Sequence, residues 1–132
     1  MKSNFYIIKF FIIFFYCFLQ LNHVFSKDLN FKASEIITYE EGNLVIGKKD
    51  AEAKINGELE IYADKFTYNR DKETLVAEGN VKAVDIINKI DIQSNKIFYD
   101  KTQNKIVSFG KTNFIVDKIY TIYSEDVHFL LN

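Results

Sequence analysis

The sequence has no proline, no tryptophan and one cysteine among its 132 residues, and its formal net charge is only −1. A nearly neutral chain without a basic patch interleaved with aromatics does not fit a nucleic-acid-binding protein. We find no Ser/His/Asp order, glycine-rich phosphate loop or metal-ligand spacing, so we expect neither an enzyme nor a cofactor or metal ion. Apolar residues form 48% of the chain and aromatics 16%, which argues against wholesale disorder and is enough for the core of one domain.

The first 26 residues have the pattern of a secretory signal peptide. A cationic start precedes an apolar run at 10–21, and a polar segment with small side chains ends at Ser26. This run is shorter than the roughly 20 residues that a membrane-spanning helix needs. We therefore expect cleavage of the signal helix at 1–26, with a retained N-terminal anchor as the alternative. Cys17 lies in this segment, so the mature chain would have no disulfide.

Residues 27–132 contain four copies of a repeat of about 30 residues. The copies align at Ala33, Ala63, Ser94 and Ser124, and the first three continue through a polar turn to Gly47, Gly79 and Gly110. On both sides of each turn, apolar and polar residues alternate with the two-residue period of half-buried strands. Such a repeat buries its apolar face only by stacking on its neighbours. The sequence therefore predicts one all-β domain of stacked antiparallel strands.

The apolar alternation slips by one residue inside the first arm of the repeats. In the second copy, the apolar face ends at Ala63 and resumes at Phe66. A slip of one residue turns later side chains to the opposite face unless the strand bends or bulges. We predict corners at Asp64–Lys65, Asn95–Lys96 and Glu125–Asp126. Corners at these places would keep both halves of each strand facing inward.

The inward positions would form one apolar strip. Its predicted lining residues are Leu59, Ile61, Ala63, Phe66, Tyr68, Leu75, Ala77, Val81, Ile90, Ile92, Ile97, Tyr99 and Phe114. From the pattern alone, the strip fits a packed core and a ligand groove equally well. Mid-strand positions with small residues leave room for a close backbone, a large side chain or a ligand. These positions are Ala77, Gly79, Ser108 and Gly110.

Isolated polar residues are expected to have structural roles. Asn80 follows Gly79, and both residue types tolerate positive φ, so we predict a tight turn or bulge there. Asp64 should satisfy backbone groups at its corner. His128 lies between two apolar residues of an alternating segment and should face solvent rather than bind a ligand.

The segment IYADKFTYNRDKETLVAEGNVKAVD, from Ile61 to Asp85, resembles the OstA-like family. The matching pattern is a small residue and an aspartate before two aromatics, a polar turn, and then A-x-G-N-V. Its residues here are Ala63, Asp64, Phe66, Tyr68, Ala77, Gly79, Asn80 and Val81. The resemblance covers about residues 31–132. It is strong in the second repeat, moderate in the third, where Lys111 follows Gly110, and weak in the first.

This family comprises the periplasmic bridge proteins of lipopolysaccharide transport and the N-terminal domain of the outer-membrane assembly protein LptD. The opening strand at 31–39 looks more like the LptD domain, which implies a domain incomplete at its C-terminus and continued by an outer-membrane β-barrel. A free periplasmic bridge protein of the LptA type is the alternative.

The resemblance implies a twisted antiparallel β-jellyroll, located in the periplasm in association with the outer membrane. Its interior would bind the acyl chains of lipid A, the lipid part of lipopolysaccharide. Its edges would join those of other jellyrolls of the transport system. An alternative function of a different class is that of a structural, adhesin-like β-repeat protein, which would have a dry core and no lipid groove.

Overall fold

The protein is described by a computed structural model that covers residues 29–131, so the predicted signal segment at 1–26 lies outside the described residues. Ten β-strands and one short 3-10 helix, η1 (Glu40–Gly42), follow one another in this part of the chain. The strands are β1 (Leu29–Lys32), β2 (Glu35–Tyr39), β3 (Leu44–Ile55), β4 (Leu59–Asn69), β5 (Thr74–Asp85), β6 (Ile90–Asp100), β7 (Lys105–Phe109), β8 (Thr112–Val116), β9 (Tyr120–Ser124) and β10 (Val127–Leu130). Within 29–131, no helix is long and apolar enough to cross a membrane.

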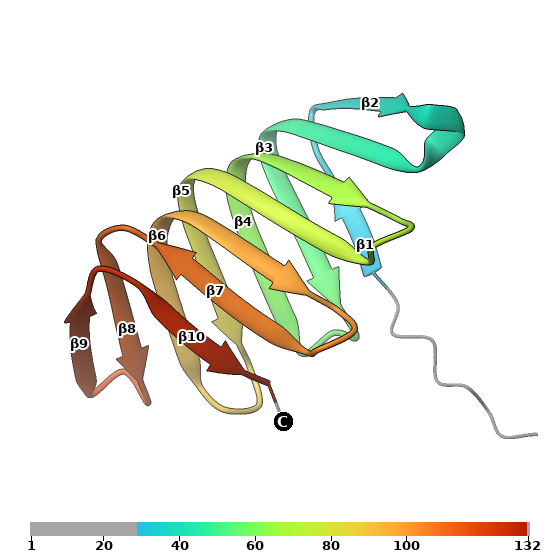
Figure 1. Cartoon of the computed structure of the whole chain (residues 1–132). Coiled ribbons are helices and arrows are strands. Elements are labelled where there is room, and N and C mark those ends of the chain that lie inside the picture. Colours follow the sequence, from blue (N-terminus) through green and yellow to red (C-terminus); the bar gives the residue numbers. More distant parts are fainter. Residues whose placement is uncertain (1–28, 132) are drawn as a thin grey trace, which may run out of the picture.

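The strands form one antiparallel sheet that folds back on itself into two facing halves (Figure 1). The long strands β3 to β6 run through both halves. The β7 half contains β2, β7 and β10 with the segments 44–48, 65–69, 74–78 and 96–100. The β8 half contains β1, β8 and β9 with the segments 51–55, 59–63, 81–85 and 90–94. This is the twisted, all-β jellyroll that the sequence predicts.

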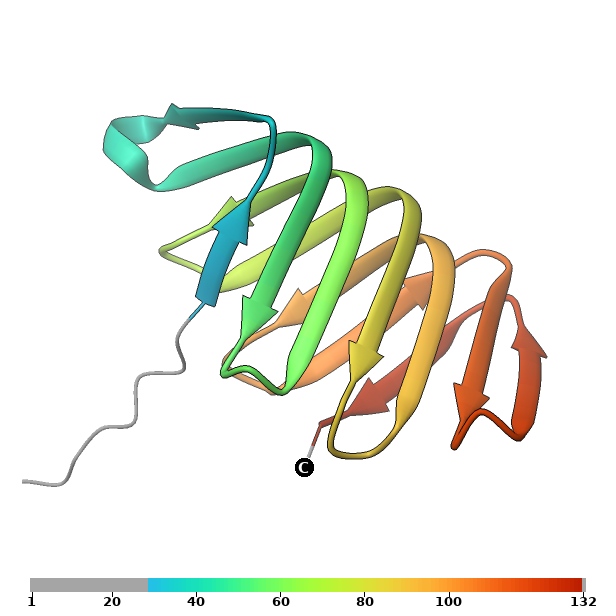
Figure 2. The same cartoon turned by 180° about the vertical axis from the view of Figure 1, so that it is seen from behind.

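Both ends of the jellyroll are open. β1 and β2 lie at one end, and β9 and β10 lie at the other (Figure 2). The outer edges of these four strands carry backbone groups that pair with no other described strand. Exposed strand edges of this kind are the usual place where another strand is added to a sheet.

The three predicted corners are confirmed. In β4, the register with β5 shifts within 62–65. In β6, the neighbouring strand changes from β8, up to Gln93, to β7, from Lys96. The third corner separates β9 from β10, and similar breaks separate β1 from β2 and β7 from β8. The inner strands therefore bend through the corner, whereas the outer ones break there.

Two glycine-containing sites show how local sequence sets the path of the chain. The hairpin between β3 and β4 turns on Asn56 and Gly57, with φ of 53° and 71°. Three residues, 56–58, connect the paired residues Ile55 and Leu59, and Asn-Gly supplies the positive φ that this turn requires. Gly47 lies beneath the ring of Phe66, which a Cβ atom at this position would approach to 2.5 Å. A larger residue at Gly47 would displace that ring from the core.

Gly110 is a turn residue as expected, but the prediction that it lies in mid-strand next to another group is wrong. This residue lies between β7 and β8 rather than inside a strand, and it is exposed. A Cβ atom there would meet nothing within 4 Å. Glycine is favoured here because the backbone φ is 77°, a conformation that is energetically unfavourable for residues with a Cβ atom. The residue allows a tight break between strands, not a close approach.

Candidate functional site

The inward side chains form rows that cross the whole sheet from one open end to the other. One row of register partners in the β8 half consists of Phe31, Ala53, Ile61, Ala83, Ile92, Phe114 and Ile122. A row in the β7 half consists of Ile36, Gly47, Phe66, Ala77, Ile97, Ser108 and Val127. These rows are almost entirely apolar. The strip predicted from the sequence is therefore continuous, and it reaches both unpaired edges.

All the predicted lining residues point into the space between the two halves. Ala63 and Phe114 are partly buried, and the others are buried, with exposures from 1% to 8%. Their side chains pack on one another as a hydrophobic core in this structure. Because protein cores are close-packed, a guest between the halves would require them to move apart.

The residues of the OstA-like motif lie at the corner where β4 and β5 bend. Gly79 and Asn80 have φ of 79° and 46°, which confirms the predicted bulge. The Asn80 side chain donates a hydrogen bond to Asp64 Oδ2 at 2.9 Å, and a Cβ atom on Gly79 would collide with the Asp64 carboxylate. The predicted role of Asp64 is thus corrected, because its carboxylate accepts from a side-chain amide, where backbone groups were expected. The motif residues therefore join β4 and β5 at the corner.

A cluster of buried hydroxyl groups occupies the corner nearest the C-terminus. Thr112 Oγ1 lies 2.9 Å from Ser108 Oγ and 3.3 Å from Ser94 Oγ, and it donates to the carbonyl oxygen of Gly110 at 2.8 Å. All three hydroxyl residues are buried. Sequence reasoning treated Ser94 and Ser108 only as small residues. Their signal was that serine replaces the alanine found at the equivalent positions of the second repeat, Ala63 and Ala77.

Near the N-terminal end, an aromatic cluster packs between the two halves. The ring of Phe31 on β1 stacks on Phe66 at a centroid distance of 4.9 Å and lies 5.0 Å from Tyr68. These residues come from opposite halves, so the rings bridge them. Outside the cluster, Ile36 and Tyr39 of β2 are about half exposed, at 51% and 50%.

The C-terminal end is less covered. Phe114 of β8 meets Phe129 of β10 edge to face, with centroids 5.6 Å apart. Beyond them, every residue of β9 is exposed, and Ile122 and Tyr120 on its inward face are 54% and 68% exposed. This end thus presents both an unpaired strand edge and uncovered apolar side chains.

The halves meet again on the side away from the corners, where polar side chains form a rim. A small hollow there is lined from both halves by residues that include Leu59, Asp85, Asn104 and Leu131. Asp85 is buried, and its carboxylate accepts from the backbone and side chain of Asn88 at 2.9 and 2.7 Å. Asn104 and the residue after β10, Leu131, exchange two hydrogen bonds at 2.7 and 2.8 Å. Along this seam the edges of the two halves lie next to each other.

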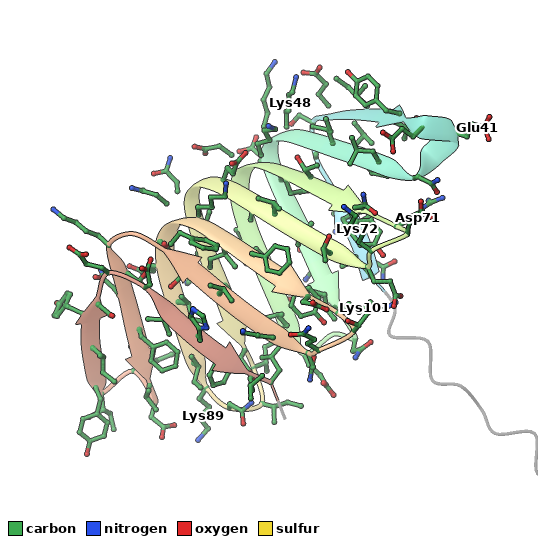
Figure 3. All side chains as sticks on the ribbon, in the orientation of Figure 1. Glu41, Lys48, Asp71, Lys72, Lys89 and Lys101 are labelled. Atoms are coloured by element: carbon green, nitrogen blue, oxygen red, sulfur yellow. The ribbon has the colours of Figure 1, made fainter. Side chains whose placement is uncertain are left out.

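Charged side chains lie on the outside and at the turns. Figure 3 labels six of them: Glu41, Lys48, Asp71, Lys72, Lys89 and Lys101. On the outer face, Glu78 lies between Lys96 at 3.1 Å and Lys65 at 3.4 Å, and hydrogen bonding to Lys96 above all lowers the pKa of its carboxyl. His128 is exposed as predicted. Within the described range, no three His, Cys, Asp or Glu residues gather closely enough for a metal ion.

The architecture defined by these features is an open antiparallel β-jellyroll with an apolar interior and two free ends. The chain is similar to the crystal structure of LptH, titled the LptA homologous periplasmic component of the conserved lipopolysaccharide transport device from Pseudomonas aeruginosa. The TM-score is 0.70 at 14% sequence identity, over 78% of this chain and 76% of LptH. At this identity, the likeness shows that the fold is shared. No family model and no curated protein sequence matches the chain.

Proposed function

We propose that this protein is a periplasmic component of lipopolysaccharide transport, which binds lipid A acyl chains between the two halves of its jellyroll. The observation that carries the proposal is the set of apolar rows that run from one unpaired edge to the other. Rows of this kind would continue into a neighbouring jellyroll. The fold of LptH and the OstA-like motif support the same assignment.

The physical basis of binding is the transfer of acyl chains from water into the apolar strip. Each buried methylene group contributes about 0.8 kcal/mol, so several chains together can offset the cost of separating the halves. The phosphorylated head group would remain in water beyond the polar seam at Asn104 and Leu131.

Photo-crosslinking tests this placement. A photoreactive amino acid at Phe66 or Val81, both 2% exposed, should form adducts with lipopolysaccharide. The same group at Glu60 or Lys82, whose side chains lie outside, serves as the matched control. Adducts confined to the outer positions would contradict binding between the halves.

We propose further that the open ends join other jellyrolls of the transport system edge to edge. Ile122→Lys on β9 and Ile36→Lys on β2 place a charge among the apolar side chains of each end, and both should abolish end-to-end association. Ile86, which is 51% exposed like Ile36 but lies in the β5–β6 turn, provides the control variant Ile86→Lys. Association can be followed by analytical ultracentrifugation. Equal effects of all three variants would argue against joining through the edges.

Two forms of this function remain distinct. The opening strand favours the N-terminal domain of an LptD-type protein, which an outer-membrane barrel would follow, with export through residues 1–26. The likeness to LptH, a periplasmic component, fits a free LptA-type bridge protein equally well. Whether a barrel sequence follows residue 132 in the gene distinguishes the two.

One observation favours a function of another class. The interior is tightly packed, as expected for a structural β-repeat with a dry core. Such a protein would bind neither a hydrophobic dye nor lipid. Titration of the purified protein with the dye N-phenylnaphthylamine separates this alternative from lipid transport, which requires saturable dye uptake.

A further inference from the structure

The hydroxyl group of Tyr99 is buried without a partner. The residue lies in the β7 half of β6 and is 1% exposed. Of the buried side-chain oxygen and nitrogen atoms in the described part of the chain, its Oη alone has no hydrogen bond. Burying an unpaired hydroxyl is unfavourable, because the group gives up its hydrogen bonds to water. The Tyr99 hydroxyl therefore makes no hydrogen bond that would stabilise the fold.

The other buried polar side chains within residues 29–131 have hydrogen-bond partners. Ser94, Ser108 and Thr112 bond to one another through Thr112, and Asp85 bonds to Asn88. The unpaired state of Tyr99 is therefore not a general feature of this interior.

The surroundings of Tyr99 indicate which kind of group could pair with it. Its register neighbours are Leu75 on β5 and Ile106 on β7, both 1% exposed. Burial raises the pKa of the phenol to about 12, so the group is a neutral hydrogen-bond donor at physiological pH. A lone neutral donor does not compensate for the burial of a phosphate charge. It does match an uncharged oxygen on an otherwise apolar molecule.

We infer that Tyr99 is a specificity-determining residue whose hydroxyl donates a hydrogen bond to the ester or amide carbonyl of a bound acyl chain. This inference rests on the proposed function, because it requires the halves to admit such a chain. The residue would then select acyl chains that carry a carbonyl over plain hydrocarbon. The cost of the unpaired hydroxyl in the empty protein would be recovered on binding.

The test compares Tyr99→Phe with wild type and with Tyr123→Phe in the full-length protein. Tyr123→Phe also removes one phenol hydroxyl, but from an exposed residue of β9 outside the apolar strip. The probes are methyl myristate and tetradecane, supplied from cyclodextrin, and binding is read as displacement of N-phenylnaphthylamine. We expect Tyr99→Phe to bind methyl myristate about tenfold more weakly, corresponding to about 1.4 kcal/mol. Tetradecane affinity should be unchanged, and Tyr123→Phe should resemble wild type with both probes.

Equal methyl myristate affinity in wild type and Tyr99→Phe would overturn the inference while leaving lipid binding intact. Failure of the wild type to take up either probe would instead overturn the proposed function, and the inference with it. A second measurement uses infrared spectroscopy, in which the bound ester carbonyl should absorb at lower frequency in wild type than in Tyr99→Phe. The melting temperature of the empty protein should stay the same or rise in Tyr99→Phe. A fall would show that water or another group already satisfies the hydroxyl, which also overturns the inference.

Discussion

The N-terminal and C-terminal parts of the interior are held together by different combinations of forces. Near β1, the rings of Phe31, Phe66 and Tyr68 bridge the two halves by apolar packing. Toward β9, Phe114 and Phe129 also pack across the halves, and the corner adds hydrogen bonds among buried hydroxyls, centred on Thr112. Every residue of β9 is exposed. Different copies of the same repeat thus join the two halves in different ways. The C-terminal part also presents more uncovered apolar surface to a partner.

This difference matters for how the jellyroll could open. Aromatic packing loses stability gradually as rings separate, whereas a buried hydrogen-bond cluster loses it when any one member is left unpaired. We therefore expect the C-terminal part to depend on a few polar contacts, and the N-terminal part on ring volume.

The largest expected effect is on the aromatic cluster. Phe31→Ala should lower the free energy of unfolding by about 3 kcal/mol, because it removes a ring that contacts two others from the opposite half. Phe129→Ala at the other end removes a ring with one aromatic neighbour, and its cost should be smaller by about 1 kcal/mol. Urea denaturation of both variants measures the difference. An equal or larger cost for Phe129→Ala would remove the proposed asymmetry.

The hydroxyl cluster provides the next test. Thr112→Val keeps the side-chain volume but leaves Ser108 and Ser94 without this shared partner, and should cost about 2 kcal/mol. Thr121→Val on exposed β9 is the matched control and should change stability by less than about 0.5 kcal/mol. If the two variants unfold at the same urea concentration, the C-terminal corner does not depend on its hydrogen bonds.

The sequence was sufficient to predict the features that arise from local patterns. The one-residue slip at Ala63 located the corner in β4, and alternation assigned the inward residues, because strand periodicity is a property of neighbouring positions. It did not reveal that Phe31 stacks on Phe66, since these residues lie on strands from different repeats and different halves. The Asn56–Gly57 hairpin was missed even though its signal was local. Periodicity also could not decide between core and groove, because it identifies the inward face and not the space in front of it.

Tyr99 gives an alkaline signature to the C-terminal part of the interior. Its folded pKa of about 12 is above the ordinary value of 10.0, because burial disfavours the phenolate. Above pH 10 the unfolded chain releases this proton while the folded protein keeps it, so stability falls as pH rises toward the folded pKa. The loss should reach about 1.4 kcal/mol near pH 11. Urea titrations of wild type and Tyr99→Phe between pH 9 and 11 measure this contribution.

The variant Tyr99→Phe should lose less stability than wild type over this range. The exposed residue Tyr123, at 77% exposure, supplies the control, and Tyr123→Phe should retain the alkaline loss of wild type. If both variants follow the wild-type curve, the alkaline sensitivity arises elsewhere.

The smallest effect is expected in the middle of the sheet, on its outer face, where neither end contributes. Lys65, Glu78 and Lys96 form an ion-pair ladder across β4, β5 and β6. The pKa of Glu78 is lowered, so its contribution is present above the unfolded pKa and is lost as pH falls through the folded value. Because the group is exposed to solvent, Glu78→Gln should cost only about 0.5 kcal/mol at pH 7.

Salt and acid distinguish this ladder from the packing at either end. The difference between wild type and Glu78→Gln should shrink in 1 M NaCl, where the Debye length is about 3 Å, and vanish below the folded pKa of Glu78. Asp71→Asn, on the exposed turn between β4 and β5, is the control for loss of one negative charge. A Glu78→Gln cost that persists in high salt would mean that the outer face is held by packing of the long side chains, and not by their charges.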